Sequence, residues 1–268
     1  MKLVALDIDG TLVRHGETTP SPATGAAIAE LQALGVAVVL ASGRMFPGTV
    51  AIARHLRLET PLICQQGCAI HTHDGEMLHC FPIDRGAALD IVAYARRIDR
   101  PYEWFNPVRY VVSRSTPEAL EYGRVSGITP EFRPDPELSG IDPTGVGIIS
   151  SHEEASAVHR ALAELHGDRL HLLDFPSVTV AVAPEANKGH ALSLLCTDLD
   201  IDRSDVVAVG DSVNDAPMLA WAGQGFAMAQ ADRYALDACD EVLPDEPDAL
   251  ATLLEALVRA GRSGRRMR

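Results

Sequence analysis

The first dozen residues constrain the fold of this chain more than any other stretch. Leu3 to Leu6 form an apolar run that is typical of a strand buried on both faces of a parallel sheet. The run stops at two carboxylates, Asp7 and Asp9, and Gly10 allows a sharp turn just after them. Because residues two apart in an extended segment point to the same side, both carboxylates are expected to face one space at the carboxyl end of the strand. Two such acids repel each other, which predicts a cation between them, most simply Mg²⁺.

Two further apolar runs also end in polar residues. Val36 to Ala41 ends at Ser42-Gly43-Arg44, and Val206 to Val209 ends at the segment from Gly210 to Asp215. A helix predicted from Pro22 to about Leu34 joins the first two runs into a βαβ unit. If the three strands are parallel neighbours, their polar ends meet at one edge of the sheet. The predicted fold class is therefore α/β with a parallel sheet.

Such an edge is suited to phosphoryl transfer, which needs a positioned nucleophile, a metal that neutralises charge and donors around the phosphoryl oxygens. Asp7, at the end of the strand, is the candidate nucleophile and would form an aspartyl-phosphate that water hydrolyses. Asp9 is the candidate acid and base, which would protonate the leaving oxygen and later deprotonate the attacking water. Asp211, with Asp215 behind it, would supply hard oxygens for Mg²⁺.

The composition of the chain singles out Lys188. Of the 23 basic residues only Lys2 and Lys188 are lysines, and the rest are arginines. A compact ammonium fits between a carboxylate and a phosphate where a planar guanidinium does not. Lys188 also opens a predicted helix, where the helix dipole does not stabilise it. The alternative is an ordinary surface lysine, but the position favours function. Further donors to a phosphate are expected from Ser42 and from the backbone around Thr11 and Gly43.

The texture of the sequence changes between residues 81 and 185. Strands alternate with helices there, which indicates a sheet covered on one face. The predicted strands are Tyr102–Phe105, Val108–Ser113, Val146–Ser150 and Val178–Val182. We therefore predict a core made of residues 1–80 and 186–268 and a second, smaller α/β domain at 81–185.

Cysteines and histidines are dense between Cys64 and Cys80, which raises the alternative of a zinc site. Their spacing matches no common zinc finger or ribbon. The alternation around His71 and His73 favours a hairpin with solvated histidines that turns at Asp74-Gly75.

Charge and hydropathy argue against several classes of partner. The net charge of −14 disfavours binding to nucleic acid, and no apolar run approaches the about 20 residues that span a bilayer. Five scattered cysteines suit a reducing cytosol, which predicts a cytoplasmic protein.

The arginine-rich end, Arg259 to Arg268, is predicted to be frayed and solvated. The oligomeric state, monomer or homodimer, stays open.

Four segments, in their order along the chain, resemble the motifs of the haloacid dehalogenase superfamily. They are Asp7-Ile-Asp-Gly-Thr, Ser42-Gly-Arg, Asn187-Lys188-Gly and Gly210-Asp211-Ser-Val-Asn214-Asp215. The length and position of the inserted domain resemble those of the Cof-type subfamily. This resemblance covers the whole chain and implies a Rossmann-like core, an α/β cap over the site and Mg²⁺. It also implies a phosphatase that acts on small phosphorylated metabolites, often sugar phosphates.

The resemblance implies a role for each residue that matches a motif. Asp7 would be the nucleophile, Asp9 the acid and base, and Ser42 and Lys188 would hold the phosphate. The further residues implied around the substrate are Gly10, Thr11, Gly43, Arg44, Gln66, Gly67 and Asn214.

The same resemblance implies a magnesium site at the first and fourth motifs. Its ligands would be Asp7, Asp211 and, through its carbonyl, Asp9. Asp215 and Asn214 would support them.

Two segments depart from the pattern of the subfamily. Gln66-Gly67 stands where Asn-Gly is frequent, and Met228-Ala229-Gln230 stands where Met-Gly-Asn is usual. Both leave the charged chemistry intact and affect substrate identity and loop geometry. The cap residues that set specificity are not identified by the sequence. One set in the predicted cap hairpin is either specific for substrate or an exposed surface, and the surface is favoured: Glu103, Trp104, Asn106 and Arg109.

Other functions remain as alternatives. A phosphomutase would use the same pair, Asp7 and Asp9, and would need a cap that holds a bisphosphate while it reorients. A dehalogenase has no need of Asp9, and a metabolite-binding protein without activity has no need of an acid and base. The intact motifs therefore favour a phosphatase.

Overall fold

The computed structural model describes residues 1–14 and 16–263. Its centre is a five-stranded parallel sheet in which β1 (Leu3–Leu6) lies between β12 (Val206–Gly210) and β2 (Ala37–Leu40). Leu3 pairs with Val206 on one side and with Ala37 on the other, so the three predicted strands are parallel neighbours. In spatial order the strands are β14 (Glu241–Val242), β13 (Gln224–Ala227), β12 (Val206–Gly210), β1 (Leu3–Leu6) and β2 (Ala37–Leu40).

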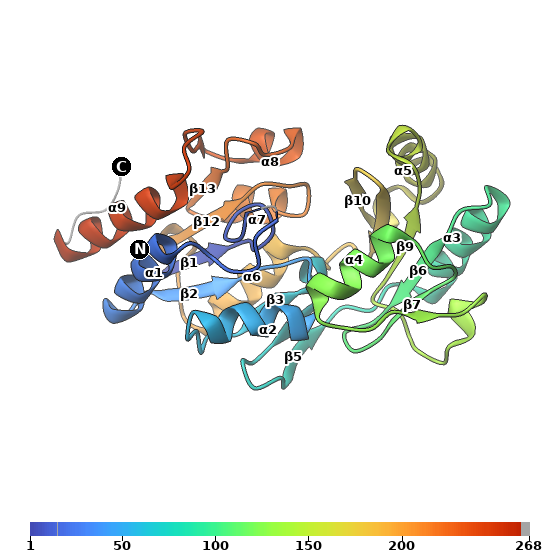
Figure 1. The fold of residues 1–268 in the computed structure, drawn as a ribbon, viewed down its shortest axis with the longest axis horizontal. Helices are drawn as coiled ribbons and strands as arrows, with labels where there is room; N and C mark the ends of the chain where they lie inside the picture. Colours follow the sequence, from blue (N-terminus) through green and yellow to red (C-terminus); the bar gives the residue numbers. More distant parts are fainter. Residues whose placement is uncertain (15, 264–268) are drawn as a thin grey trace.

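Helices cover both faces of this sheet (Figure 1). One layer consists of α1 (Pro22–Ala33), α2 (Phe46–His55) and α9 (Ala249–Ser263). The other consists of α6 (Lys188–Asp198), α7 (Ala216–Trp221) and α8 (Arg233–Ala238). A parallel sheet between two helical layers is the predicted Rossmann-like α/β core. Of the arginine-rich end, residues 259–263 are helical rather than frayed, and 264–268 lie outside the described residues.

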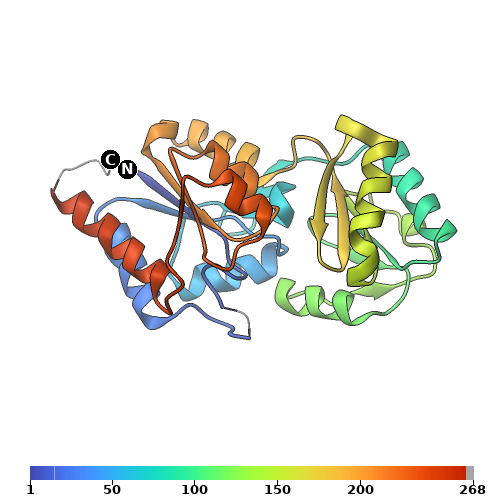
Figure 2. The ribbon, with the colours of Figure 1, turned by 90° about the horizontal axis from the view of Figure 1, so that it is seen from above.

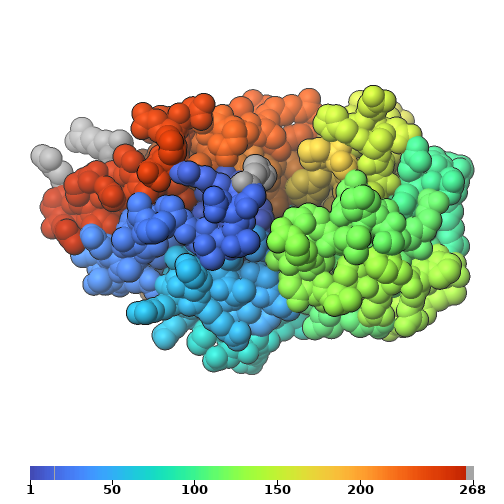
Figure 3. Space-filling model, viewed as in Figure 1, coloured from blue at the N-terminus to red at the C-terminus, as the bar shows by residue number. Residues whose placement is uncertain are grey.

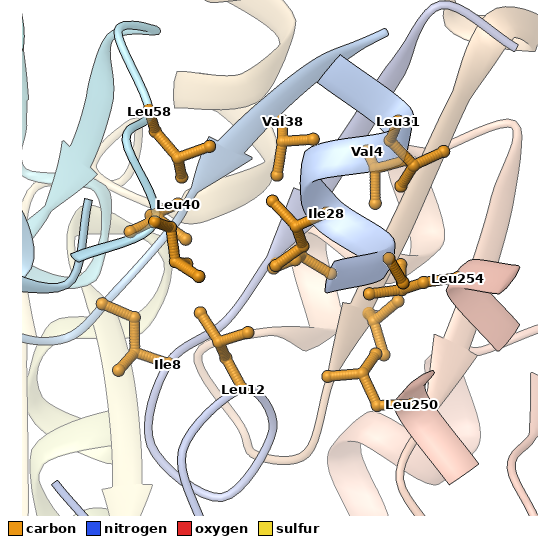
Figure 4. Packing of buried hydrophobic residues seen from close by; sticks show 14 of the residues in the cluster. Val4, Ile8, Leu12, Ile28, Leu31, Val38, Leu40, Leu58, Leu250 and Leu254 are labelled. Carbon is orange, nitrogen blue, oxygen red and sulfur yellow. The ribbon is translucent and has the colours of Figure 1, made fainter. Parts of the chain in front are cut away.

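The side chains of β1 divide between the two layers because neighbouring residues of a strand point to opposite faces. Val4 packs in the first layer and Leu3 in the second, and both are fully buried. Figure 4 shows the first layer, where Val4 and Val38 of the sheet lie close to Ile28 and Leu31 of α1. Burial on both faces explains why the strand is apolar throughout.

A second, three-stranded sheet follows β2. It consists of β3 (Leu62–Cys64) and the predicted hairpin of β4 (Ala69–His71) and β5 (Met77–Cys80). A single parallel bridge between Ala41 and Ile63 connects it to the core. His71 is buried, with its ring 4.9 Å from that of Phe46 in α2. The prediction of solvated histidines is therefore wrong for His71, because the hairpin packs against α2.

The chain leaves the core after β5 and returns to it at α6, and the segment between forms a separate body, the cap (Figures 1 and 2). Its sheet has the order β10 (His171–Phe175), β11 (Val178–Val182), β9 (Gly145–Ile149), β6 (Tyr102–Phe105), β7 (Tyr110–Val112) and β8 (Glu131–Phe132). The two edge strands, β10 and β8, were not among the predicted strands. The limits of an independently folding cap, residues 81–185, stay a prediction.

Both faces of the cap sheet are covered, so the prediction of one covered face is wrong. The helices α3 (Arg85–Arg97) and α5 (His152–His166) pack on one face. The other face meets α4 (Pro117–Ser126) and residues of the core such as Met45. Short 3-10 turns complete the chain at Gln65–Gly67, Pro136–Leu138, Gly167–Arg169 and Arg203–Asp205.

The packing of the cap sheet also determines which side chains of the cap hairpin are exposed. Glu103 and Trp104, for which an exposed surface was favoured, are 5% and 0% exposed on opposite faces of the cap sheet. Asn106 forms the turn by accepting hydrogen bonds from the backbone amides of Val108 and Arg109.

Within the described ranges, none of the helices combines the length and the apolar character that crossing a bilayer requires.

Candidate active site

Asp7 follows β1 directly and is in contact with a buried ammonium group. Lys188 Nζ lies 2.6 Å from Asp7 Oδ1 and 2.6 Å from Asp215 Oδ1. The side chain of Lys188 is fully buried, so the alternative of a surface lysine is wrong. Hydrogen bonds between ionised groups at this length are among the strongest in proteins. They join the end of β1, the start of α6 and the loop after β12.

The position of Lys188 depends on how α6 begins. Asn187 is the N-cap of this helix, and its side chain accepts a hydrogen bond from the amide of His190 at 2.8 Å. Gly67, with a φ of 100°, lies so close to the backbone of Asn187 that a Cβ there would collide with it. The glycine thus allows the loop after β3 to support the first turn of α6.

The loop after β12 is organised by the carboxylate of Asp215. Its Oδ2 accepts hydrogen bonds from the backbone amides of Asp211, at 2.9 Å, and Ser212, at 3.0 Å. Asp211 Oδ1 in turn accepts from Thr11 Oγ1 at 2.9 Å. Gly10, with a φ of 92°, has no Cβ that would collide with the Asp211 carboxylate. The loops after two adjacent strands are therefore joined side chain to side chain.

The electrostatics of this cluster are dominated by its burial. Burial raises the pKa of Asp7 well above its usual range, and Asp215 adds to this while Lys188 opposes it. Burial and the neighbouring Asp215 raise the pKa of Asp211 to about 7. Burial disfavours the ammonium of Lys188, but Asp215 and Asp7 outweigh this and raise its pKa. Three carboxylates around one ammonium leave an excess of negative charge.

The cluster has the donors that a magnesium ion needs. One oxygen from each of Asp7, Asp211 and Asp215 lies within 4.8 Å of the others, and no other such group of acids, histidines or cysteines occurs among the described residues. Both oxygens of Asp215 already accept hydrogen bonds. Within the described residues, Oδ2 of Asp7 and Oδ2 of Asp211 have no hydrogen-bond partner. Two open carboxylate oxygens facing excess negative charge suit a hard divalent cation.

Asp9 lies outside this cluster. Its carboxylate is 45% exposed and accepts from Arg44 Nε at 2.8 Å and Arg44 Nη2 at 2.5 Å. The expectation that Asp7 and Asp9 face one space is therefore wrong for this conformation, because β1 ends at Leu6 and the chain turns at once. Ser42 is fully buried next to this pair, and its Oγ accepts from the amide of Arg44 at 3.1 Å.

The two glutamines that depart from the subfamily pattern each bind a loop of the site. Gln66 Oε1 accepts a hydrogen bond from Asn214 Nδ2. Its amide also lies over Gly43, where a Cβ would come within 2.7 Å of Gln66 Nε2. Gln230 Nε2 donates to the carbonyl oxygen of Gly10 at 2.7 Å. The longer side chains thus connect neighbouring loops around the site.

Two residues of α4, neither of which was predicted from the sequence, connect the cap to the core. The hydroxyl of Tyr122 donates to the carbonyl oxygen of Gly43 at 3.2 Å, and Ser126 Oγ accepts from the amide of Met45 at 3.2 Å. Figure 3 shows this part of the cap, in green, against the blue core. Tyr122 and Ser126 are four residues apart and therefore lie on one face of the helix, which the sequence could have indicated. This spacing does not indicate which part of the chain that face contacts.

Buried carboxylates and a buried lysine lie at the strand ends of a parallel sheet, beneath a cap. This arrangement is that of a capped α/β hydrolase. Residues 4–254 match the family model described as haloacid dehalogenase-like hydrolase. The chain therefore belongs to this family.

Relatives and solved structures agree with this assignment. The chain is 27% identical to phosphatase YwpJ of Bacillus subtilis, over 96% of this chain and 100% of YwpJ. It is 28% identical to the HMP-PP phosphatase of an Enterobacter species, over 86% and 85% of the two chains. A haloacid dehalogenase-like hydrolase from B. subtilis superposes with a TM-score of 0.83 at 26% identity, covering 96% of this chain and 100% of the other. A sugar phosphatase of HAD subclass IIB, 18% identical over 96% and 99% of the two chains, has a TM-score of 0.81 and supports the fold.

Proposed function

We propose that this phosphatase of the haloacid dehalogenase family hydrolyses a small phosphomonoester with Mg²⁺, through an aspartyl-phosphate on Asp7. The observation that carries the proposal is the 2.6 Å contact between Asp7 Oδ1 and the buried Lys188, which leaves Asp7 Oδ2 open among the described residues. The names of the relatives, phosphatase YwpJ and HMP-PP phosphatase, support a phosphate ester as the substrate. Sugar phosphates are one class of such esters.

The reaction proceeds in two displacements at phosphorus. An oxygen of the Asp7 carboxylate attacks the phosphorus, the bond between phosphorus and the leaving oxygen breaks, and Asp9 gives that oxygen a proton. Water then attacks the phosphorus of the aspartyl-phosphate and gives a proton to Asp9. The bond between phosphorus and Asp7 breaks, and inorganic phosphate leaves. Lys188 and Ser42 hold the phosphoryl oxygens during both displacements.

Asp9 must leave Arg44 to carry out these proton transfers. The two hydrogen bonds from the guanidinium occupy both carboxylate oxygens of Asp9 and hold them against Arg44. Arrival of the substrate phosphate offers Arg44 a second anion, so the guanidinium can turn from Asp9 towards the substrate.

Asp7 and Asp211, together with the carbonyl of Asp9, would hold the Mg²⁺, and Asp215 and Asn214 would orient the loop behind them. When bound, the ion supplies positive charge beside the phosphoryl oxygens. Asp215 acts through its hydrogen bonds to Lys188 and to the amides of the loop.

All five cysteines are free thiols, which supports a cytoplasmic location. A monomer or homodimer stays a prediction.

Replacing the nucleophile tests the proposal. Asp7→Asn should lower the turnover of acetyl phosphate with Mg²⁺ by at least about a thousandfold, since an amide of the same shape does not attack phosphorus. Released inorganic phosphate is measured, after the melting temperature has shown that the variant is folded. A variant that retains a tenth of the parental turnover would contradict covalent catalysis by Asp7. Acetyl phosphate has no second hydroxyl group, so a sugar phosphate such as glucose 6-phosphate tests the alternative: an isomerised ester in place of released phosphate would indicate the phosphomutase.

A further inference from the structure

A cavity of about 210 Å³ lies between the cap and the core. Gln66 lines it from the core and Tyr122 from α4 of the cap. Both side chains also contact Gly43, which follows Ser42 in the proposed phosphate-binding loop. The cavity therefore begins beside the phosphate site. It is smaller than the about 300–1,000 Å³ of pockets for drug-sized ligands, so it suits the leaving group of a small metabolite.

Most of the surface that lines this cavity is apolar and comes from four of its eight residues. Phe105 comes from β6, Val178 and Val180 come from β11, and Phe175 ends β10. Figure 2 shows the hairpin of β10 and β11 on the side of the cap that faces the core. A sugar carries hydroxyl groups around its ring, and apolar walls would leave several of them without hydrogen-bond partners. A flat or branched apolar group fits these walls better.

The polar groups of the cavity, apart from Gln66 and the Tyr122 hydroxyl, are two carboxylates, Glu103 and Glu118. Glu103 is only 5% exposed, and its Oε1 accepts a hydrogen bond from the hydroxyl of Tyr110. Its Oε2 has no hydrogen-bond partner within the described residues and lies over Gly147, where a Cβ would collide with it. No lysine, arginine or histidine lines the cavity in the part of the chain that the structure describes. An open oxygen on a buried carboxylate needs a hydrogen-bond donor, and a cationic donor satisfies it best.

We propose that this cavity binds the leaving group of the substrate and selects a compact, apolar or aromatic group that carries a protonated nitrogen, with Glu103 as its partner. This inference rests on the proposed function, because that function places the phosphate beside Gly43. The substrate class is therefore a phosphate ester of an organic amine or of an amino-substituted ring, rather than of a sugar.

Two phosphonates of equal size test this selection without turnover. The probes are 4-(aminomethyl)benzylphosphonate and 4-ethylbenzylphosphonate, which differ by an ammonium in place of a methyl group. Their Kd values are measured by calorimetry on the whole chain with Mg²⁺ at pH 8. We expect the amine to bind about tenfold or more tightly than the ethyl compound. Glucose 6-phosphate, added as a competitor, should displace the amine only weakly.

Matched variants assign the selection to one residue. Glu103→Gln keeps the shape and the acceptor for Tyr110 but loses the charge, and it should reduce the ratio of the two Kd values to about twofold or less. Glu164→Gln, on the exposed surface of α5, is the control and should keep the parental ratio. Equal binding of the two phosphonates by the parent, a ratio that survives Glu103→Gln or tighter binding of the sugar phosphate would overturn the inference. Turnover of acetyl phosphate, measured separately, reports on the proposed function alone.

Discussion

A buried ammonium is stable in this chain because two carboxylates neutralise it. Lys188 has no exposed surface and contacts Asp7 and Asp215 at 2.6 Å each. Breaking a buried ion pair by removing one partner costs about 3–5 kcal/mol, because the other charges stay buried. The same three residues therefore support both the fold around the strand ends and the proposed chemistry.

Lys188→Arg should be nearly as damaging to turnover as Lys188→Ala. A guanidinium keeps the charge, but it is wider and planar and cannot lie 2.6 Å from both carboxylate oxygens without moving them. A displacement of about 1 Å at reacting groups can cost on the order of a hundredfold in rate. Turnover of acetyl phosphate by the two variants is compared after their melting curves are recorded. Near-parental turnover of the arginine variant would show that shape at this position is unimportant.

Glu103 should make the stability of the protein fall as the pH rises. Burial raises the pKa of Glu103 from 4.5 to about 7. Between these values the folded state binds more protons than the unfolded state, so raising the pH favours unfolding. Glu103 should contribute about 2–3 kcal/mol to this loss between pH 5 and pH 8, and Glu103→Gln should lack that contribution.

Urea unfolding of the parent and of Glu103→Gln across this pH range measures the difference, since other titrating groups affect both proteins alike. The other ionisable groups near Glu103 are Tyr110, Tyr122 and Glu118. Curves that stay parallel from pH 5 to pH 8 would mean that Glu103 ionises normally.

At the scale of elements, the contact between α2 and α4 joins the core to the cap. Gly48 of α2 lies against the backbone of Val125 and Ser126 in α4, and a Cβ at Gly48 would collide with the Val125 carbonyl oxygen. This close approach allows Ser126 to bond the amide of Met45. The contact between the cap and the core thus depends on a position that has no side chain.

Gly48→Ala should separate α2 from α4 and lower kcat/KM about tenfold or more, because the cap is then displaced from its position over the active site. Gly25→Ala in α1 is the matched control, since a Cβ there meets only Leu56 Cδ2 at 3.8 Å. The control should keep its activity and gain about 0.5–1 kcal/mol of stability from the better helix former. Equal activity of the two variants would show that closure does not need this contact.

At the scale of the whole molecule, folding collects acids from distant parts of the chain around one cation. Asp7 and Asp211 keep open oxygens within this cluster, and burial raises the pKa of both. The repulsion between the carboxylates of this cluster destabilises the metal-free protein, and a bound divalent ion would offset this repulsion. Metal binding should therefore be visible as stability as well as activity.

Saturating Mg²⁺ should raise the melting temperature of the parent by several degrees, because a ligand at a hundred times its Kd adds about 2.7 kcal/mol. Asp211→Asn should lose this shift and, without Mg²⁺, should melt above the parent because one repelling charge is gone. Asp90→Asn, at an exposed position of α3, should behave like the parent in both respects. A parent whose melting temperature ignores Mg²⁺, or whose activity survives exhaustive chelation, would contradict the metal site.

Local patterns were sufficient to predict the core. Leu3–Leu6 and Val206–Val209 are apolar throughout because helices cover both faces of their sheet, and this pattern is visible without the structure. The polar residues that follow each run lie at one sheet edge because parallel strands point the same way. Lys188 could be predicted to take part because it is rare in this chain, although 181 positions separate it from Asp7.

Only the tertiary structure decided which of these polar groups meet. The pairing of Asp9 with Arg44, 35 positions away, depends on the turn after β1, and no periodicity encodes that turn. Glu103 lies in an alternating strand, a pattern that predicts two different faces without saying what covers either. Whether water or a second body covers a face depends on where the rest of the chain lies, and here the core and α4 cover the face that contains Glu103.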